Sequence, residues 1–137
     1  MEKLKYKYEL LKKAYKTLEH QVNELFNTKR KLDVWEKITY EDSVIKRFEY
    51  SYEMTGKYLK EYLEAKHGIK VASPKTVFQE SMKQNIFDEQ KANTLLSMVE
   101  DRNNTSHGYD EAIAKDIINR VPRYVSIMNF ILENVTP

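Results

Sequence analysis

Apolar side chains recur every three or four residues along most of this 137-residue chain. That spacing places them on one side of an α-helix, whereas a half-buried strand would need strict alternation. The first stripe lies between Lys3 and about Asn27 and consists of Leu4, Tyr8, Leu11, Tyr15, Leu18, Val22 and Leu25. A heptad-like stripe of this length predicts one long helix that packs against other helices, with its tyrosines in the core.

A second long helix is predicted from about Glu41 to Lys66, where Gly68 ends it. Between the two helices, residues 28–40 are charged and weakly periodic, so we expect a connection with at most a short helical turn. Trp35 is expected to be its one large apolar anchor.

Capping residues mark the starts of two more helices. Ser73 followed by Pro74 is typical of an N-cap and a first helical position, and it predicts a short helix that runs to about Gln84. Asp88 is the N-cap candidate of a fourth helix, which leads through Leu95 toward Arg102.

The fifth helix is predicted to begin at Asp110 and to continue across Pro122 with a kink. Only three glycines and three prolines are present, which favours a helical protein. The chain is therefore predicted to be all-α: an antiparallel helical bundle of four long helices plus one short helix, in a single domain over residues 1–137.

Composition excludes several kinds of chemistry. There is no cysteine, so disulfides, thiolate catalysis and cysteine zinc sites are excluded. The three histidines are far apart and form no metal-binding motif, and no glycine-rich phosphate loop is present, so no metal and no cofactor are expected. No apolar stretch approaches membrane-spanning length, and we expect a cytoplasmic protein without membrane contact.

Charge gives no strong reason to assign nucleic-acid binding, because the net charge is only +2. Residues 1–40 are nonetheless net basic and residues 88–137 net acidic. Any binding of a polyanion at the acidic part would need help from elsewhere, such as the lysines of the first helix. The alternative is that these lysines simply form a solvated helix face.

The stretch from Glu100 to Asp110 carries the most distinctive side chains. Leu95, Val99 and Arg102 follow helical spacing, so Arg102 extends a face that should be buried and needs a partner there. Gly108 is suited to end this helix, which would leave His107 in its last turn beside unpaired carbonyls.

An ordinary helix cap is the simplest explanation of a His-Gly pair, because a cation suits the end of a helix. His67-Gly68 ends another predicted helix, but the positions equivalent to Arg102 and Tyr109 hold Tyr62 and Ile69. Capping therefore explains the pair without explaining the arginine and the tyrosine, and on the residues alone both interpretations stay open.

Arg102, His107 and Tyr109 together resemble the R-x4-H-x-Y signature of HEPN proteins, the higher-eukaryote and prokaryote nucleotide-binding helical bundles. Two blocks, Arg47 to Glu53 with Lys57 and Glu100 to His107, resemble the nucleotidyltransferase substrate-binding branch of that group. The resemblance covers most of the chain from about Tyr40 onward. Members of this branch are typically encoded beside a small nucleotidyltransferase, and related pairs act as toxin and antitoxin.

The resemblance implies a metal-independent endoribonuclease that uses Arg102 and His107 on an RNA substrate. It also implies that a cognate minimal nucleotidyltransferase, the antitoxin, transfers AMP to Tyr109. Asn103, Thr105 and Ser106 are candidate supporting polar residues, although polar residues near a helix end are equally suited to be caps. One histidine cannot act as base and acid in a single step, so a homodimer with Arg102 and His107 at its interface is expected.

Two other functions stay open. The branch name implies a non-catalytic substrate-binding subunit of a nucleotidyltransferase, and a purely structural bundle is the third possibility. A neighbouring gene for a nucleotidyltransferase would support the pairing.

Overall fold

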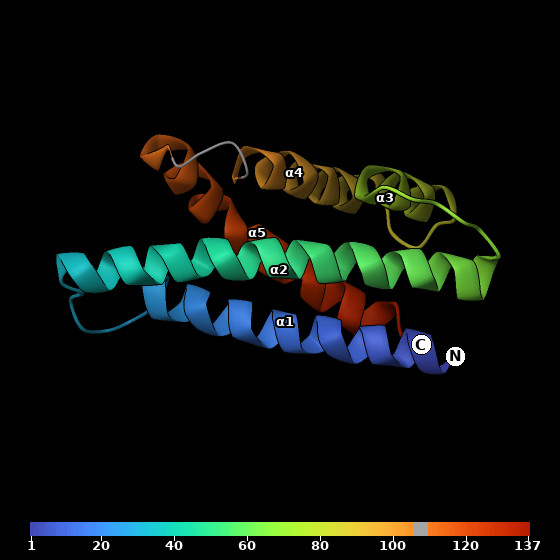
Figure 1. Cartoon of the computed structure of the whole chain (residues 1–137), viewed down its shortest axis with the longest axis horizontal. Helices are drawn as coiled ribbons and strands as arrows, with labels where there is room; N and C mark the ends of the chain where they lie inside the picture. Colours follow the sequence, from blue (N-terminus) through green and yellow to red (C-terminus); the bar gives the residue numbers. More distant parts are fainter. Residues whose placement is uncertain (106–109) are drawn as a thin grey trace.

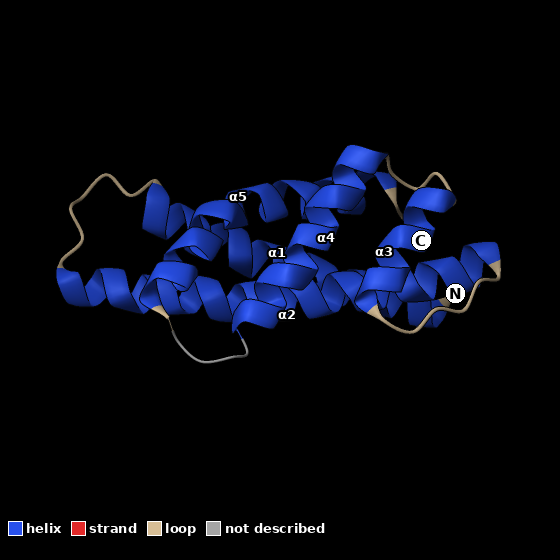
Figure 2. Ribbon diagram, turned by 90° about the horizontal axis from the view of Figure 1, so that it is seen from above, coloured by secondary structure: helices blue, strands red, loops and turns tan. Residues whose placement is uncertain are grey.

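The computed structural model describes residues 1–105 and 110–137. It contains the helices α1 (Glu2–Phe26), α2 (Val34–His67), α3 (Pro74–Lys83), α4 (Glu89–Thr105) and α5 (Glu111–Asn134). In Figure 1, α1 and α2 lie side by side and antiparallel, α3 and α4 lie on the opposite side of α2 from α1, and α5 crosses behind them. Every regular element of the described residues is a helix (Figure 2). The predicted bundle of four long helices and one short helix is confirmed.

All five helices contribute to the core. Leu4, Leu11 and Leu18 of α1 are fully buried, as the stripe predicts. Tyr58 of α2 is also buried, its ring packs edge-on against Tyr8 at 5.5 Å, and its hydroxyl donates to a carbonyl at the end of α5. The phenolic groups therefore find backbone acceptors while their rings fill the core.

The start of α2 differs from the prediction. The helix begins at Val34 and not near Glu41, because Asp33 and Glu36 form a reciprocal capping box that starts it seven residues earlier. The prediction that Trp35 anchors this segment in the core is wrong, because this residue is 77% exposed. The buried Val44 lies nine positions after Trp35, about two and a half helical turns, so the two side chains point in opposite directions.

The remaining boundaries follow the predicted caps. The Ser73 side chain accepts from the Thr76 amide, and the Asp88 carboxylate accepts from the Lys91 amide at 2.9 Å. Asp110 accepts from the first amides of α5, and that helix continues through Pro122 to Asn134. The kink at Pro122 stays a prediction. Within the described residues, no helix has the length and hydropathy needed to cross a bilayer.

Candidate functional site

Arg102 lies in the last turn of α4 and faces α2. Its Nη1 is 3.1 Å from Oε2 of Glu49, and the two side chains are 34% and 29% exposed. Arg102 is thus partly buried and has a carboxylate partner, which explains how a cation sits beside an otherwise apolar face. Glu53, one turn along α2 from Glu49, pairs instead with Lys57 at 2.9 Å.

Thr105 joins this ion pair one turn further along α4. Its hydroxyl accepts from Arg102 Nη1 at 3.2 Å, and its single proton lies within reach of two acceptors. These are the Arg102 carbonyl at 2.8 Å and Glu49 Oε2 at 3.3 Å. The hydroxyl therefore connects the guanidinium, the carboxylate and the end of the helix in one cluster, which we call the Arg102 cluster (Glu49, Arg102 and Thr105).

Tyr52, one turn along α2 from Glu49, borders the Arg102 cluster. Burial raises the pKa of Tyr52, and the positive charge of Arg102 partly opposes that rise. The Tyr52 ring packs edge-on against Phe78 of α3, with ring centroids 6.5 Å apart. One border of the cluster is therefore an aromatic contact between α2 and α3.

Asp101 faces α5 and is nearly fully buried, at 3% exposure. Arg120 binds it at two points, with Nε 2.9 Å from Oδ2 and Nη2 2.7 Å from Oδ1. The Tyr124 hydroxyl donates to Oδ2 of Asp101 and lies 2.8 Å from the Ser97 hydroxyl. A buried carboxylate needs this degree of pairing, because an unpaired charge there would be costly.

The electrostatics of this buried network follow from its contacts. Burial and the hydrogen bond to Asp101 raise the pKa of Tyr124 to about 12. The same carboxylate raises the pKa of Arg120. Both partners of Asp101 therefore stay protonated to a higher pH than they would in isolation, and the junction of α4 with α5 is fixed by a two-point ion pair.

A profile of the family described as nucleotidyltransferase substrate binding protein like matches residues 6–136. The chain belongs to this family. Its fold is also that of a protein from Thermus thermophilus, at 33% identity and a TM-score of 0.76, over 90% of this chain and 96% of that one.

Two toxin–antitoxin structures share the fold at lower identity. One is a tri-AMPylated Shewanella oneidensis HEPN toxin in complex with MNT antitoxin, 18% identical, with a TM-score of 0.73 over 96% of this chain and 95% of that one. The other is a mutant of the toxin–antitoxin MntA-HpeT, 19% identical, with a TM-score of 0.75 over 98% of both chains. No curated protein matches this sequence.

In this member of the family, the structure places only part of the predicted site. Arg102 and Thr105 come together, whereas Asn103 lies on an exposed side of α4. Ser106, His107 and Tyr109 lie outside the described residues, as does the predicted helix end at Gly108.

The described residues on either side of the segment 106–109 lie close together. Thr105 and Asp110, the two residues that flank the segment 106–109, line the same small hollow together with Ile113. Thr105 is a member of the Arg102 cluster, so Asp110 also lies near this cluster.

Sequence reasoning missed Glu49, Asp101 and Arg120. The buried side of α4 consists of Ala92, Leu95, Met98 and Asp101. The predicted stripe shares Leu95 with it but continues through Val99 and Arg102, each one residue after the buried Met98 and Asp101. Asp101 follows Met98 by three residues and so continues the spacing of the buried side chains, which predicts a buried carboxylate. A buried carboxylate in turn requires a cation on the facing helix. Among the described residues, no group of histidine and acidic side chains is arranged to hold a metal ion.

Proposed function

We propose that this chain is the HEPN toxin partner of a minimal nucleotidyltransferase and acts as a metal-independent endoribonuclease. Arg102 and His107 are its catalytic residues, and AMP transfer to Tyr109 silences it. The observation that supports this proposal most is the Arg102 cluster, which holds a partly exposed guanidinium at the end of α4, directly before the segment that carries His107. Family membership and the toxin–antitoxin structures of the same fold support it further.

The proposed reaction uses the nucleophile that RNA carries. His107 removes the proton of a 2′-hydroxyl, and the oxygen attacks the adjacent phosphorus. The bond to the 5′-oxygen breaks, that oxygen takes up a proton, and a 2′,3′-cyclic phosphate remains. Arg102 stabilises the charge that builds up on the phosphoryl oxygens, because its planar fork of donors matches them.

Glu49 gives Arg102 a partner while no RNA is bound. Both polar contacts of the guanidinium with the described side chains of the cluster use Nη1, whereas an arginine has five N–H donors. A phosphate that approaches the other edge can be bound without breaking the Glu49 contact. Glu49 and Thr105 are therefore proposed to orient Arg102 for the scissile phosphate.

A homodimer completes this chemistry. One imidazole cannot be base and acid in the same step, and a second copy would supply the second one. An isologous pair with Arg102 and His107 at its interface would bring two copies of the motif to one cleft. The proposed partners are thus a second copy, the cognate nucleotidyltransferase and an RNA substrate.

Cleavage of RNA in the presence of EDTA tests the proposal. Purified wild type should cleave a single-stranded RNA, and His107→Ala and Arg102→Ala should not. His67→Ala is the matched control, because His67 is likewise followed by a glycine, Gly68, which ends α2, and this variant should keep full activity. Cleavage that persists in His107→Ala, or that EDTA abolishes in the wild type, would contradict this mechanism.

The alternative function is a non-catalytic subunit that presents a substrate to a nucleotidyltransferase, as the description of the family suggests. It predicts that wild-type protein binds the nucleotidyltransferase but leaves RNA intact under all conditions. The same EDTA experiment, run beside a pull-down of the two proteins, separates the two functions.

A further inference from the structure

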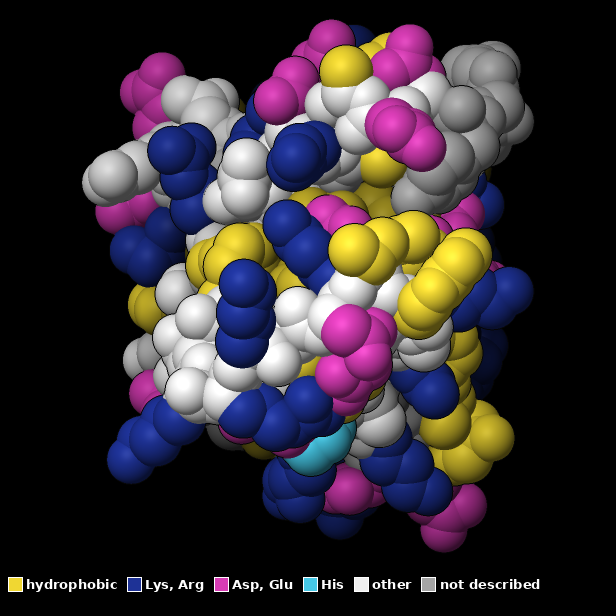
Figure 3. All heavy atoms as spheres, turned by 90° about the vertical axis from the view of Figure 1, so that its left-hand side faces the viewer, with side chains coloured by type: hydrophobic (Ala, Val, Ile, Leu, Met, Phe, Trp, Pro, Cys, Tyr) yellow, Lys and Arg dark blue, Asp and Glu magenta, His cyan; other side chains and the backbone are white. Residues whose placement is uncertain are grey.

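Large apolar side chains are exposed at one end of the molecule, where α1 ends and α2 and α5 begin (Figure 1). Eight large hydrophobic side chains of the described residues are exposed, and five of them lie here. We call these five the apolar end: Phe26, Val34, Trp35, Ile38 and Ile113. Figure 3 faces this end and shows hydrophobic side chains grouped between basic and acidic ones. Exposed apolar side chains that gather at one end of a molecule indicate an interaction site more often than isolated ones do.

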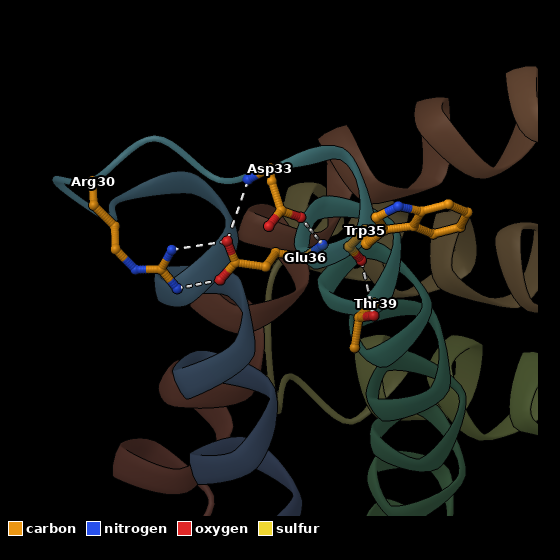
Figure 4. A network of polar contacts seen from close by, with 5 residues as sticks. All are labelled: Arg30, Asp33, Trp35, Glu36 and Thr39. Carbon is orange, nitrogen blue, oxygen red and sulfur yellow. Dashed lines mark hydrogen bonds and ion pairs between the residues drawn. The ribbon is translucent and has the colours of Figure 1, made fainter.

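A local polar network surrounds the backbone of Trp35 (Figure 4). Arg30 binds the Glu36 carboxylate with both terminal nitrogens, and the same carboxylate caps the Asp33 amide. The Thr39 hydroxyl donates to the Trp35 carbonyl at 2.9 Å. The backbone around an exposed tryptophan is thus ordered before any partner arrives, which lowers the entropic cost of binding.

A hollow adjoins this tryptophan on the same end of the molecule. Its lining consists of the apolar side chains Ile38, Ala114 and Ile118, three acidic residues, Glu41, Asp42 and Glu111, and one basic residue, Lys115. Ile38 follows Trp35 by about one helical turn, so the protruding ring and the hollow are neighbours.

The charges around the apolar end are unevenly distributed. Lys29 and Lys31 lie in the connection that precedes Trp35, whereas the lining of the hollow is mainly acidic, with Glu41, Asp42 and Glu111 against Lys115. A surface with a knob and a hollow, and with a basic and an acidic border, is complementary to itself under a two-fold rotation.

We infer that the apolar end binds a second copy of this chain, with Trp35 of each copy seated in the hollow of the other. Lys29 and Lys31 of one copy then approach Glu41 and Glu111 of the other. The inference rests on the homodimer of the proposed function and names the surface that forms it. Ile113 belongs both to the apolar end and to the hollow that Thr105 and Asp110 line, so this surface extends to the residues that flank the motif segment.

Trp35 is the only tryptophan in the chain, so its fluorescence reports on the surface directly. As wild-type concentration rises, the emission maximum should move to shorter wavelength, together with an increase in mass measured by light scattering. Emission that stays at the wavelength of exposed tryptophan in a proven dimer would overturn the inference.

Trp35→Phe and Trp35→Ala test the contact itself. Because Trp35 is 77% exposed, neither change should alter the circular dichroism of the monomer. Trp35→Ala should weaken dimerisation by about 30-fold or more, as expected for a central aromatic contact. Tyr6→Ala is the control, because Tyr6 is another exposed aromatic residue, 64% exposed, on α1 and outside the apolar end.

A charge exchange adds a second readout. Lys31→Glu and Glu111→Lys should each weaken the dimer, and the double variant should recover part of the loss. If the wild type is a monomer at all concentrations, both this surface and the homodimer of the proposed function are wrong. If the dimer survives Trp35→Ala unchanged, only this surface is wrong, and loss of nucleotidyltransferase binding in that variant would assign the surface to that partner instead.

Discussion

Asp101 and Arg102 are consecutive residues whose side chains bind opposite neighbours. Asp101 pairs with Arg120 of α5, and Arg102 pairs with Glu49 of α2, at 2.7 Å and 3.1 Å for the closest atoms. The last turn of α4 is therefore fixed from two sides, immediately before the segment that carries His107. Rigid support of this kind is what positions a reactive side chain, because small displacements of a catalytic group lower rates strongly.

Asp101→Asn should destabilise the fold. The amide cannot match the charge or the two-point binding of Arg120, and it leaves a buried polar group poorly paired. Since the Arg120 side chain is 37% exposed and can be hydrated, we expect a loss of about 2–3 kcal/mol, below the usual cost of breaking a fully buried pair. Calorimetry should show a melting temperature lower by roughly 8 °C. Asp116→Asn, at an exposed position of α5, should leave it unchanged.

Glu49→Gln should strengthen RNA binding. The amide keeps a hydrogen-bond acceptor near Arg102 but removes the negative charge that opposes phosphate. The exposed fraction of both side chains limits the effect, so about a threefold to tenfold tighter dissociation constant is expected at low salt. Fluorescence anisotropy with a labelled RNA measures it. Glu53→Gln, one turn away and paired only with Lys57 among the described ion pairs, is the matched control and should change binding less.

Arg102→Ala should abolish RNA cleavage with little loss of stability. The side chain is 34% exposed and its ion pair is partly screened, so a melting shift of at most a few degrees is expected. His107→Ala should behave in the same way. Arg102→Lys keeps the charge without the planar fork and should restore little activity. Gross unfolding of either alanine variant in a thermal scan would assign these residues to the fold and not to catalysis.

Helical spacing and capping residues predicted most of the fold. The stripe of α1, the cap at Ser73 and the continuation of α5 through Pro122 depend on residues close together in sequence, and all three are confirmed. The start of α2 was placed too late because its apolar spacing is weak, whereas the signal was the Asp33–Glu36 capping box.

The contacts of the site could not be predicted to the same extent. The sequence singles out Arg102, but its partner Glu49 lies 53 residues away. Nothing in the spacing of residues distinguishes Glu49 from Glu53 as the carboxylate that pairs with Arg102. Asp101 and Arg102 differ by one position on the helix, about 100° of rotation, which an apolar stripe does not resolve. Ion pairs between helices depend on how the helices pack, and the periodicity of a single helix does not predict them.

Stability should fall at high pH. Burial and a hydrogen bond to Glu19 raise the pKa of Tyr15 to about 12, and burial with the bond to Asp101 raises that of Tyr124 to about 12. Both lie above the value of about 10 in the unfolded chain. Their contribution is therefore complete below about pH 10 and is lost as the pH rises through about 12. Urea unfolding across this range should show the fall, and it should be less steep in Tyr15→Phe, whereas Tyr6→Phe should resemble the wild type.

Tyr109 should be the point at which the nucleotidyltransferase controls this protein. The proposed reaction transfers AMP from ATP to the tyrosine hydroxyl, with release of pyrophosphate and of the hydroxyl proton. The new phosphodiester would place negative charge beside Arg102, whose guanidinium is only partly neutralised by Glu49, and so would occupy the phosphate-binding edge and block RNA.

After co-expression with the nucleotidyltransferase, intact-mass spectrometry should show AMP-sized additions on the parent and none on Tyr109→Phe, and only the modified protein should have lost RNase activity. Tyr50→Phe, which removes an exposed hydroxyl on α2, is the control and should be labelled like the parent. Labelling that persists in Tyr109→Phe would rule out this residue as the acceptor, and full RNase activity in the modified parent would rule out silencing.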